Sequence, residues 1–409
     1  MTASPTTASV AILGGHQSDF ATNLDKSGGS VETLVHDTIQ ATVADARIDL
    51  SDIETIHVGN AFGQLYTGQG HLGAMPATVV PELWGLPAMR HEAACASSSM
   101  ATLAAMAEIE SGRYDCVLVL GVEQEKTMPG GEAAAVQEAA AWVGPDTEGA
   151  TYIWPETFDA LATEYERRYG LDERHLRAIG ELNLRNAKAN PNAQTRAWAL
   201  SADTCSDDDE VNPVVTGRLR RNDITQITDG AVGLILVSQR WLAERGRTAR
   251  STIAGWGHRT VGLGLQQKLQ RNSDSTLVMP HVNDAITDAF DRAGIEGVDQ
   301  LDAIETHDCM TPSEYMAIDH FGITAPGESW KAIEEGTLER DGSLPMNPSG
   351  GLIGGGHPVG ATGARMLLDA TKQVSNTAGG YQVDDAERVA TLNIGGSTAT
   401  TACFIVESA

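Results

Sequence analysis

Apolar positions along the chain alternate between short runs and helical spacing, which predicts an α/β protein. Apolar runs typical of buried strands occur at Ser9–Leu13, Thr55–Val58, Asp115–Leu120 and Asp229–Val237. Apolar residues recur at helical spacing over about 30–46 and 97–110. A second series of strand and helix patterns runs from about Ser251 to Ala409. This alternation is typical of parallel-type sheets covered by helices.

The middle of the chain has a different pattern, rich in Ala, Glu, Asn and Arg. It contains helical stretches at Glu156–Tyr169 and Glu173–Ala189, followed by an acidic loop at Ser206–Glu210 that we expect to be solvated. A chain of 409 residues is too long for one ordinary core. We therefore predict a first α/β half at 1–121 and 213–249, an inserted segment at 122–212 and a second half at 250–409.

The most unusual segment is Asn347–Arg365, which contains seven glycines, two prolines and one histidine, His357. Glycine allows backbone conformations and close approaches that other residues do not, and Pro358 restricts the turn directly after the histidine. A helical pattern begins near Ala361. We predict a loop that holds one imidazole rigidly where it meets a helix. The alternative is a glycine-rich surface turn with an incidental histidine.

Cys95 precedes a cluster of small residues and a helical pattern that ends near Ser111. A cysteine at the start of a helix lies near the positive end of the helix dipole, which favours the thiolate and lowers the pKa of the thiol. The alternative is a buried structural cysteine. We expect Cys116, Cys205 and Cys403 to be buried structural cysteines.

A third polar segment begins where an apolar strand pattern ends at His307-Asp308-Cys309. Thr311–Glu314 then opens a helix with residues of the capping type. Sheets of α/β proteins carry their chemistry at such strand ends. A zinc site is the alternative, but His307 and Cys309 are one residue apart and have no Cys-x-x-Cys companion, so four ligands are not available locally and no metal is expected.

Together, these segments resemble the thiolase superfamily, and most of all the branch of sterol-carrier-protein-type thiolases and archaeal acetyl-CoA acetyltransferases. The matching residues are Cys95 in Ala-Cys-Ala-Ser, His307–Cys309, Gly356–Pro358 and Asn393–Gly396. Better-known thiolases have Asn at the position of His307 and a second cysteine at the position of Asn393. In the resembling branch Cys309 takes over the work of that second cysteine, so these departures support the branch.

The resemblance implies a duplicated thiolase fold with five αβαβα layers, in which the inserted segment is a loop domain over the active site. It also implies that Cys95 attacks an acyl-CoA thioester while His357 holds its proton. Cys309 would take an α-proton from a second acetyl-CoA, whose carbon then attacks the acyl-enzyme. His307 and His357 would donate hydrogen bonds to the oxygen of the second thioester. The N–H groups of Cys95 and Gly395 would bind the other oxyanion.

The activity implied is that of an acetyl-CoA C-acetyltransferase, which condenses two acetyl-CoA or cleaves a 3-ketoacyl-CoA. Coenzyme A thioesters are then substrates, and no bound cofactor is expected. The alternatives are a degradative 3-ketoacyl-CoA thiolase, another condensing enzyme such as a ketoacyl or HMG-CoA synthase, and a thiolase-like subunit without catalysis. The second thiol at Cys309 favours a thiolase over the synthases, and the presence of both cysteines and both histidines argues against lost catalysis.

The resemblance also implies partners. Related archaeal enzymes work with HMG-CoA synthase and a small OB-fold zinc-ribbon protein that helps to hold coenzyme A. Thiolase-like chains pair through the edge strand of the first half, so a homodimer or tetramer is expected. Val117–Leu120 and the Ala-rich helix at Thr102–Ala107 are more apolar than one exposed edge would tolerate, which favours such pairing. The alternative is that this strand is central and already covered.

The net charge of −27 comes from 55 acidic residues against 28 basic ones, of which six are lysine. One interpretation is a solvated acidic surface that keeps the protein soluble. A more specific one is adaptation to high salt, because at about 1 M salt the Debye length is roughly 3 Å and such charge costs little. The charge argues against nucleic-acid binding. It would repel coenzyme A unless salt or arginines such as Arg218, Arg220 and Arg221 offset it.

Cellular location is predicted from what the chain lacks and from its cysteines. No apolar run reaches about 18 residues, so no membrane span is expected. Met1–Thr7 lacks the basic segment followed by an apolar segment that marks a secretory signal. Five cysteines without framework spacing suit a reducing compartment, and we predict a cytoplasmic protein.

Overall fold

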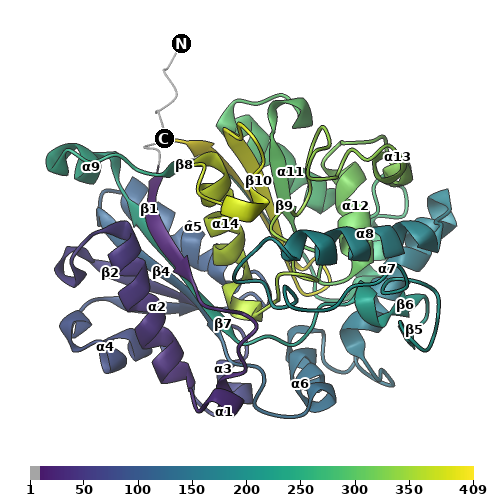
Figure 1. Cartoon of the computed structure of the whole chain (residues 1–409), viewed down its shortest axis with the longest axis horizontal. Coiled ribbons are helices and arrows are strands. Elements are labelled where there is room, and N and C mark those ends of the chain that lie inside the picture. Colours follow the sequence, from purple (N-terminus) through teal and green to yellow (C-terminus); the bar gives the residue numbers. More distant parts are fainter. Residues whose placement is uncertain (1–9) are drawn as a thin grey trace.

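The computed structural model describes residues 10–409 (Figure 1). Ser9 of the predicted first strand, and the Met1–Thr7 segment inspected for a signal, lie outside these residues. The strands are β1 Val10–Gln17, β2 Thr55–Gly59, β3 Ala88–His91, β4 Cys116–Glu123, β5 Val214–Thr216, β6 Leu219–Arg220, β7 Gly230–Val237, β8 Ser251–Thr260, β9 Ala303–Thr306, β10 Arg388–Gly395 and β11 Thr400–Ser408.

The helices are α1 Leu24–Ser27, α2 Val31–Ala46, α3 Gly63–Tyr66, α4 Met75–Val79, α5 Ser97–Glu110, α6 Gly130–Val136, α7 Ile153–Tyr169, α8 Glu173–Ala187, α9 Gln239–Arg245, α10 Leu265–Arg271, α11 Pro280–Ala293, α12 Thr311–His320, α13 Ser329–Glu334 and α14 Thr362–Val374. The predicted helical patterns correspond to α2, α5, α7, α8, α12 and α14, and the other helices were not predicted. Local signals explain helix ends: Ser30 caps α2 by accepting the N–H of Thr33, and Gly294 ends α11 in the left-handed conformation.

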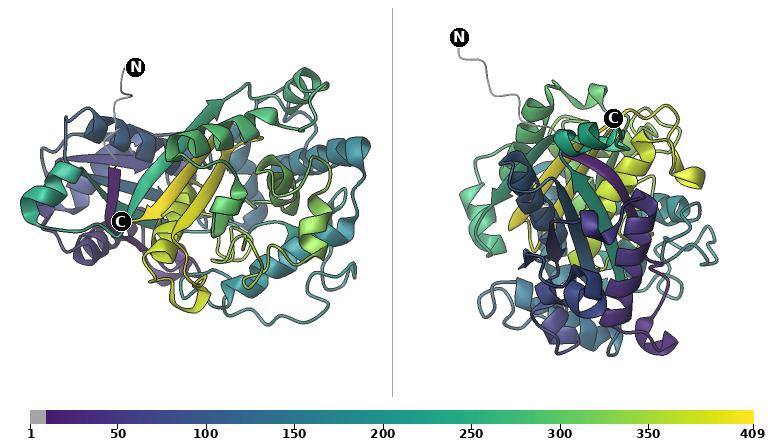
Figure 2. Two further views of the ribbon diagram at one scale, coloured as in Figure 1. Left: turned by 90° about the horizontal axis from the view of Figure 1, so that it is seen from above. Right: turned by 90° about the vertical axis from the view of Figure 1, so that its left-hand side faces the viewer.

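Nine strands form one sheet in the order β3-β2-β4-β7-β1-β8-β11-β10-β9. The order β1-β7-β4-β2 of the first half is repeated as β8-β11-β10-β9 in the second, with the same sequence of antiparallel, antiparallel and parallel pairs. The halves join where β1 pairs with β8, and they lie side by side in the left-hand view of Figure 2. The duplication predicted from element order is therefore present in the pairing itself.

Helices form three layers around the two halves of the sheet. α5 and α14 pack against one another in the centre, where Ala101 and Leu367 share a buried core with Val119 and Phe404 of the strands. α2 covers the outer face of the first half and α11 that of the second. The result is the predicted five-layer αβαβα arrangement, because each half of the sheet lies between an outer helix and the shared central pair.

The chain between β4 and β7 leaves the sheet although these two strands are neighbours in it. This segment carries α6, α7, α8, β5 and β6 and lies along the lower and right-hand side of Figure 1. Phe158 and Leu176 from this segment share a core with Tyr315 of α12, so it packs on the second half. The division at 121 and 213 stays a prediction, since β4 itself continues to Glu123.

The interpretation of Val117–Leu120 as an exposed edge is wrong. β4 lies between β2 and β7, and the side chains of all its residues are buried. Its apolar character therefore reflects burial inside one subunit and gives no support to pairing between subunits. The outer strand of the first half is β3, where Ala88 and Met89 are exposed.

Candidate active site

Cys95 lies in a tight loop between β3 and α5, directly before the helix, as the sequence predicts. Ala94 has φ +50°, a conformation that few residues other than glycine adopt. The Ser97 hydroxyl holds this loop by accepting the N–H of Ala93 at 3.0 Å and donating to the carbonyl of Ala94 at 2.6 Å. On β2, a Cβ at Gly59 would lie 2.4 Å from Cα of Ser98, so glycine there allows the helix to begin this close to the sheet.

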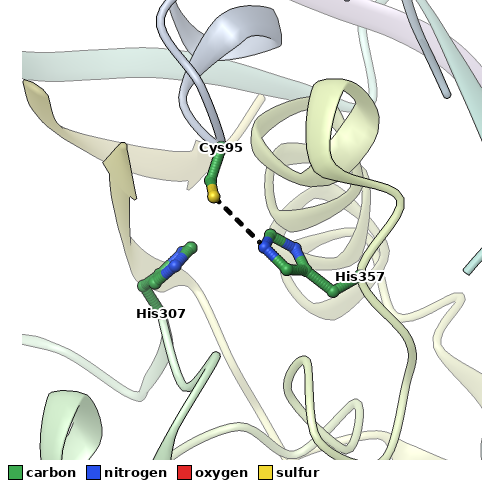
Figure 3. Close-up of side chains that lie close together, drawn as sticks. All are labelled: Cys95, His307 and His357. Atoms are coloured by element: carbon green, nitrogen blue, oxygen red, sulfur yellow. Dashed lines mark hydrogen bonds between the residues drawn. The ribbon is translucent and has the colours of Figure 1, made fainter. Parts of the chain in front are cut away.

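His357 lies at the equivalent place in the second half, in the glycine-rich loop just before α14. Its Nε2 is 3.3 Å from Sγ of Cys95, and its Nδ1 is 2.6 Å from Oγ1 of Thr362 (Figure 3). The Thr362 hydroxyl donates to the carbonyl of Pro358 at 3.1 Å, so its oxygen accepts the proton on His357 Nδ1. Nε2 is then unprotonated and accepts a hydrogen bond from the thiol. Thr362 thus fixes the tautomer in which His357 is a base for Cys95.

His307 follows β9 and presents its ring from the other side of the Cys95 sulfur (Figure 3). The Ser99 hydroxyl donates to Oδ1 of Asn393 at 2.7 Å, which turns the amide nitrogen of Asn393 toward Nδ1 of His307 at 3.2 Å. An amide nitrogen only donates, so Nδ1 accepts and the proton of His307 is on Nε2. His307 is therefore a hydrogen-bond donor, whereas His357 is an acceptor.

Cys309 completes the group. It lines a cavity of about 40 Å³ together with Cys95 and His357, and the other walls are largely apolar, including Phe62, Trp154, Phe158, Met310 and Val359. Its backbone carbonyl accepts the N–H of Thr225 at 2.9 Å, which ties the strand end to the chain that precedes β7. Burial raises the pKa of the Cys309 thiol well above its usual value, and a charge on Cys95 would raise it further.

The lowered pKa predicted for Cys95 is wrong for the resting site. Burial raises the pKa of its thiol to about 12, although the N–H of Gly396 acts in the opposite direction. Burial also lowers the pKa of His357 to about 3, with a smaller contribution from the charge of Arg365. Desolvation thus outweighs the helix dipole, and the pair is a neutral thiol bonded to a neutral imidazole. Proton transfer to His357 must accompany attack by the sulfur.

The glycines after Asn393 contribute in two ways. A Cβ at Gly395 would lie 2.2 Å from the carbonyl oxygen of Ala93, so glycine is required for β10 to approach the Cys95 loop. The N–H groups that favour the Cys95 thiolate belong to Gly396, the next residue, and to Cys95 itself. The direct oxyanion role of Gly395 therefore stays a prediction.

Buried carboxyl groups hold the His307–Cys309 segment from behind, and the sequence did not reveal them. Asp308 accepts the N–H groups of Leu352 and Ile353 in the glycine-rich loop. Asn183 of α8 donates to both Asp308, at 2.8 Å, and Glu314, at 2.6 Å. The capping role expected for Thr311–Glu314 is not observed, because Met310 is the N-cap residue and makes no side-chain cap. Of the features in the sequence, only the cluster of polar residues in α12 could have indicated this network.

The three arginines suggested to offset coenzyme A repulsion differ in their surroundings. Arg218 pairs with Asp159 and Glu166, and Arg220 is paired with aspartates of the acidic loop. Arg221 lines a second cavity of about 420 Å³, whose walls also include His357 and Met310. Of the three, Arg221 alone lines a cavity that His357 also lines.

The metal alternative can be compared with the geometry. Within residues 10–409, one group of histidine, cysteine or acidic side chains has ligand atoms close together: Cys95, His307 and His357, all within 4.8 Å. Cys309 is not part of it, so the His307 and Cys309 pairing considered for zinc is not the cluster found. The His357 nitrogen in this group already accepts a hydrogen bond from the thiol, which suits proton transfer.

No helix within residues 10–409 combines the length and apolar character needed to span a bilayer.

Comparison with known proteins identifies the family of this chain. Two family models match: "Thiolase, N-terminal domain" over residues 10–240 and "Thiolase C-terminal domain-like" over residues 265–408. An acetyl-CoA acetyltransferase of Methanothermobacter thermautotrophicus is 30% identical over 97% of this chain and 98% of its own length. Sterol carrier protein 2 of Bos taurus is 25% identical over 88% of this chain and 66% of its own.

Solved structures show the same fold. The structure titled Ltp2-ChsH2(DUF35) aldolase has a TM-score of 0.77 at 20% identity and covers 98% of both chains. Human mitochondrial 3-ketoacyl-CoA thiolase has a TM-score of 0.71 at 14% identity, over 98% of this chain and 99% of its own.

The fold and the family models define the class: this chain belongs to the thiolase family and has the duplicated thiolase fold. It is an acyltransferase, similar to archaeal acetyl-CoA acetyltransferases, and thiolases use coenzyme A thioesters as substrates.

Proposed function

We propose that the protein is an acetyl-CoA C-acetyltransferase that condenses two acetyl-CoA, or cleaves acetoacetyl-CoA in reverse, through an acyl group on Cys95. The observation that carries this proposal is that Cys95, Cys309 and His357 line one small cavity, while His307, an imidazole of opposite hydrogen-bonding character, has a ring nitrogen within 4.8 Å of the ligand atoms of Cys95 and His357. A condensing thiolase needs a nucleophile, a base for that nucleophile, a second base and an oxyanion donor. Cys95, His357, Cys309 and His307 supply these in turn.

The size of the inner cavity favours a short acyl group. Its volume of about 40 Å³ accommodates on the order of three water-sized groups, which is the number of heavy atoms in an acetyl group. Phe62, Trp154 and Phe158 are bulky walls that a long chain would have to displace. The 420 Å³ cavity shares Met310 and His357 with it and would take the thiol arm of coenzyme A, with Arg221 available for a phosphate.

In the first half-reaction, the Cys95 sulfur attacks the thioester carbonyl as its proton passes to Nε2 of His357. The oxygen becomes negative and accepts N–H bonds at the Cys95 loop, where Gly395 and Gly396 lie. The carbonyl re-forms with loss of coenzyme A thiolate, which takes a proton from the Cys309 thiol. The products are acetyl-Cys95, protonated His357, a Cys309 thiolate and free coenzyme A.

In the second half-reaction, the Cys309 thiolate removes an α-proton from another acetyl-CoA. The raised pKa of Cys309 makes this thiolate a strong base. The enolate oxygen accepts a hydrogen bond from the Nε2–H group of His307, and the α-carbon attacks the acyl carbon of acetyl-Cys95. Cys95 leaves as a thiolate and regains its proton from His357, so acetoacetyl-CoA forms and every group returns to its starting state.

The test separates the two half-reactions. Cys309→Ala should still carry an acetyl group on Cys95 after incubation with acetyl-CoA and acid quenching, because water can protonate the leaving coenzyme A thiolate, yet it should lose acetoacetyl-CoA turnover, because the α-proton has no other base. Cys205→Ala, another buried cysteine remote from the cavity, is the matched control and should retain both. Mass spectrometry locates the adduct. An acetyl group on Cys309 in the wild type, or none on either cysteine, contradicts the proposal.

The same assays distinguish the alternatives. A degradative thiolase would cleave longer 3-ketoacyl-CoA in preference to acetoacetyl-CoA, and a non-catalytic subunit would acquire no label. Activity that appears only after a partner is added would support the proposed association with HMG-CoA synthase and an OB-fold zinc-ribbon protein. One solved structure with this fold bears a title that names a DUF35 component, which supports a partner of that kind.

The remaining proposals concern the setting of the enzyme. We propose a cytoplasmic, salt-adapted homo-oligomer that pairs through the open edge at β3. Support comes from the charge of −27 and from the exposed side chains of Trp84 and Met89 beside that edge.

A further inference from the structure

Two buried glutamates hold the turn after His357 and have no part in the steps above. Glu123 and Glu125 are two residues apart at the end of β4, and both are fully buried. Glu125 accepts the N–H of Val359 at 2.7 Å, and Glu123 accepts the N–H of Gly360 at 3.1 Å. The two carboxyl groups thus bind consecutive N–H groups just beyond the catalytic histidine.

The two carboxyl groups differ in how well they are supplied with donors. Glu123 also accepts the N–H groups of Ala61 and Phe62 and the side-chain amide of Asn60. The side chain of Glu125 accepts the N–H of Val359, the amide of Gln137 at 3.2 Å and the N–H of Thr228. A buried carboxylate keeps its charge only where hydrogen-bond donors replace the lost hydration, and Glu125 has one donor fewer than Glu123. Glu125 is therefore the less suited of the two to carry charge.

Glu125 is also close enough to the nucleophile to matter. It lines the 420 Å³ cavity with His357, and a negative charge on it raises the pKa of Cys95. Gln137, which holds its second oxygen, lines the inner cavity beside Cys95. A carboxylate at this position would oppose the Cys95 thiolate that catalysis requires, whereas a neutral acid would hold the same turn without that penalty.

We propose that Glu125 is a positioning residue that works only in its neutral form, holding the turn after His357 through the Val359 N–H while placing no negative charge beside Cys95. This inference rests on the proposed role of Cys95 as the nucleophile. It extends that role by assigning a protonation state to a carboxyl group that the condensation does not use.

The groups around Glu125 point in the same direction. Burial raises the pKa of Glu125 well above its usual value, and the charges of Glu123 and Asp229 raise it further. The titratable and charged groups that face it are Glu123 on β4, Asp229 before β7, Tyr66 on α3, Lys126 in the next loop, Cys95 and His357. Lys126 directs its ammonium group to the carbonyl of Thr22, so it forms no ion pair with Glu125 in the structure.

The pH dependence of thermal stability reports the protonation state of Glu125 in the folded protein. An acid that is neutral when folded but ionised when unfolded binds more protons in the folded state, so it makes folding less favourable as the pH rises above about 4.3. Glu125→Gln has no such dependence. Its Tm minus that of the wild type should therefore increase between about pH 5 and about pH 8. A difference that is constant or decreases means that Glu125 is ionised when folded and overturns the proposal.

Alkylation of Cys95 by iodoacetamide measures the consequence without any acyl-CoA, so it is independent of the proposed activity. At about pH 7, Glu125→Gln should react within about twofold of the wild type, because the amide accepts the same N–H. As the pH is raised until the wild-type acid ionises, the variant should become at least about threefold faster than the wild type. Glu125→Ala should be slower than both at pH 7, because the turn loses its acceptor.

The control is Glu132→Gln on the exposed first turn of α6, which should match the wild type throughout. If Glu125→Gln is as defective as Glu125→Ala at pH 7, the negative charge is required and the proposal is wrong. If alkylation and stability behave as stated but acetyl-CoA gives no acyl-enzyme, the proposed function fails while the assignment of Glu125 stands.

Discussion

Thr362→Val should slow acylation of Cys95 without changing the shape of the site. Valine is nearly isosteric with threonine but cannot accept a hydrogen bond. In the wild type the Thr362 oxygen accepts from Nδ1 of His357 at 2.6 Å, and its proton is committed to the carbonyl of Pro358. Without this acceptor, a proton on Nδ1 of His357 makes no hydrogen bond to residue 362. The tautomer with an unprotonated Nε2 is then no longer favoured over the other tautomer.

The magnitude follows from the single hydrogen bond involved. A net hydrogen bond is worth about 1–1.5 kcal/mol, and 1.4 kcal/mol corresponds to about tenfold in rate. The acylation rate should therefore fall about tenfold. In the other tautomer Nε2 of His357 already carries a proton and cannot accept the proton of the Cys95 thiol. The effect on stability should be smaller than about 1.5 kcal/mol, since only one hydroxyl is removed from a site that stays packed.

Rapid quenching after mixing with acetyl-CoA, followed by mass spectrometry of the Cys95 peptide, gives the acylation rate directly. Thr42→Val is the matched control, because the Thr42 hydroxyl also donates to the carbonyl four residues earlier, at 2.7 Å, but lies in α2 away from the site. It should acylate at the wild-type rate. Acylation of Thr362→Val within twofold of the wild type would refute the tautomer argument.

The remaining predictions concern stability and assembly. The free energy of unfolding should fall as the pH decreases from about 6.5 toward 3, since His357 has a pKa of about 3 when folded but about 6.5 when unfolded; urea titrations of His357→Asn should show a flatter dependence, and equal slopes would contradict this. Gly395→Ala should lower the Tm by several degrees, because its Cβ would lie 2.2 Å from the carbonyl oxygen of Ala93, and an unchanged melt would disprove that contact. The Tm should rise between about 0.1 and 2 M KCl as screening relieves the charge of −27, whereas a constant Tm would mean that the acidity has no such role. Light scattering at high salt should give at least twice the 43.2 kDa of one chain, and active monomer would rule out the β3 pairing.

Much of the fold could be predicted from local pattern, because each predicted strand and helix carries its own periodicity and end signals. The buried run of β4 and the Ser30 start of α2 are examples. Sheet order could not be predicted in this way. Apolar character shows that Val117–Leu120 is buried, but it does not show which strands cover it, and the edge proved to be β3. Pairing between strands distant in sequence depends on the whole chain.

The candidate site divides along the same line. Cys95, His307, Cys309 and His357 stood out in the sequence because reactive residue types lay among glycines, small residues and strand ends. The tautomers and protonation states of these residues could not be predicted from the sequence. The tautomers of the two histidines depend on Thr362 and Asn393, and the neutral thiol of Cys95 depends on desolvation by segments from both halves.

The sequence by itself determined which residues are reactive and where helices and strands begin, since these follow from composition and from neighbours a few positions away. Only the tertiary structure decided that Cys95 and His357, 262 residues apart, meet at equivalent helix starts of the two halves. It also decided that their resting state is uncharged. Burial is a property of the assembled fold, and in this site its effect on pKa exceeds that of the local helix dipole from which the thiolate was predicted.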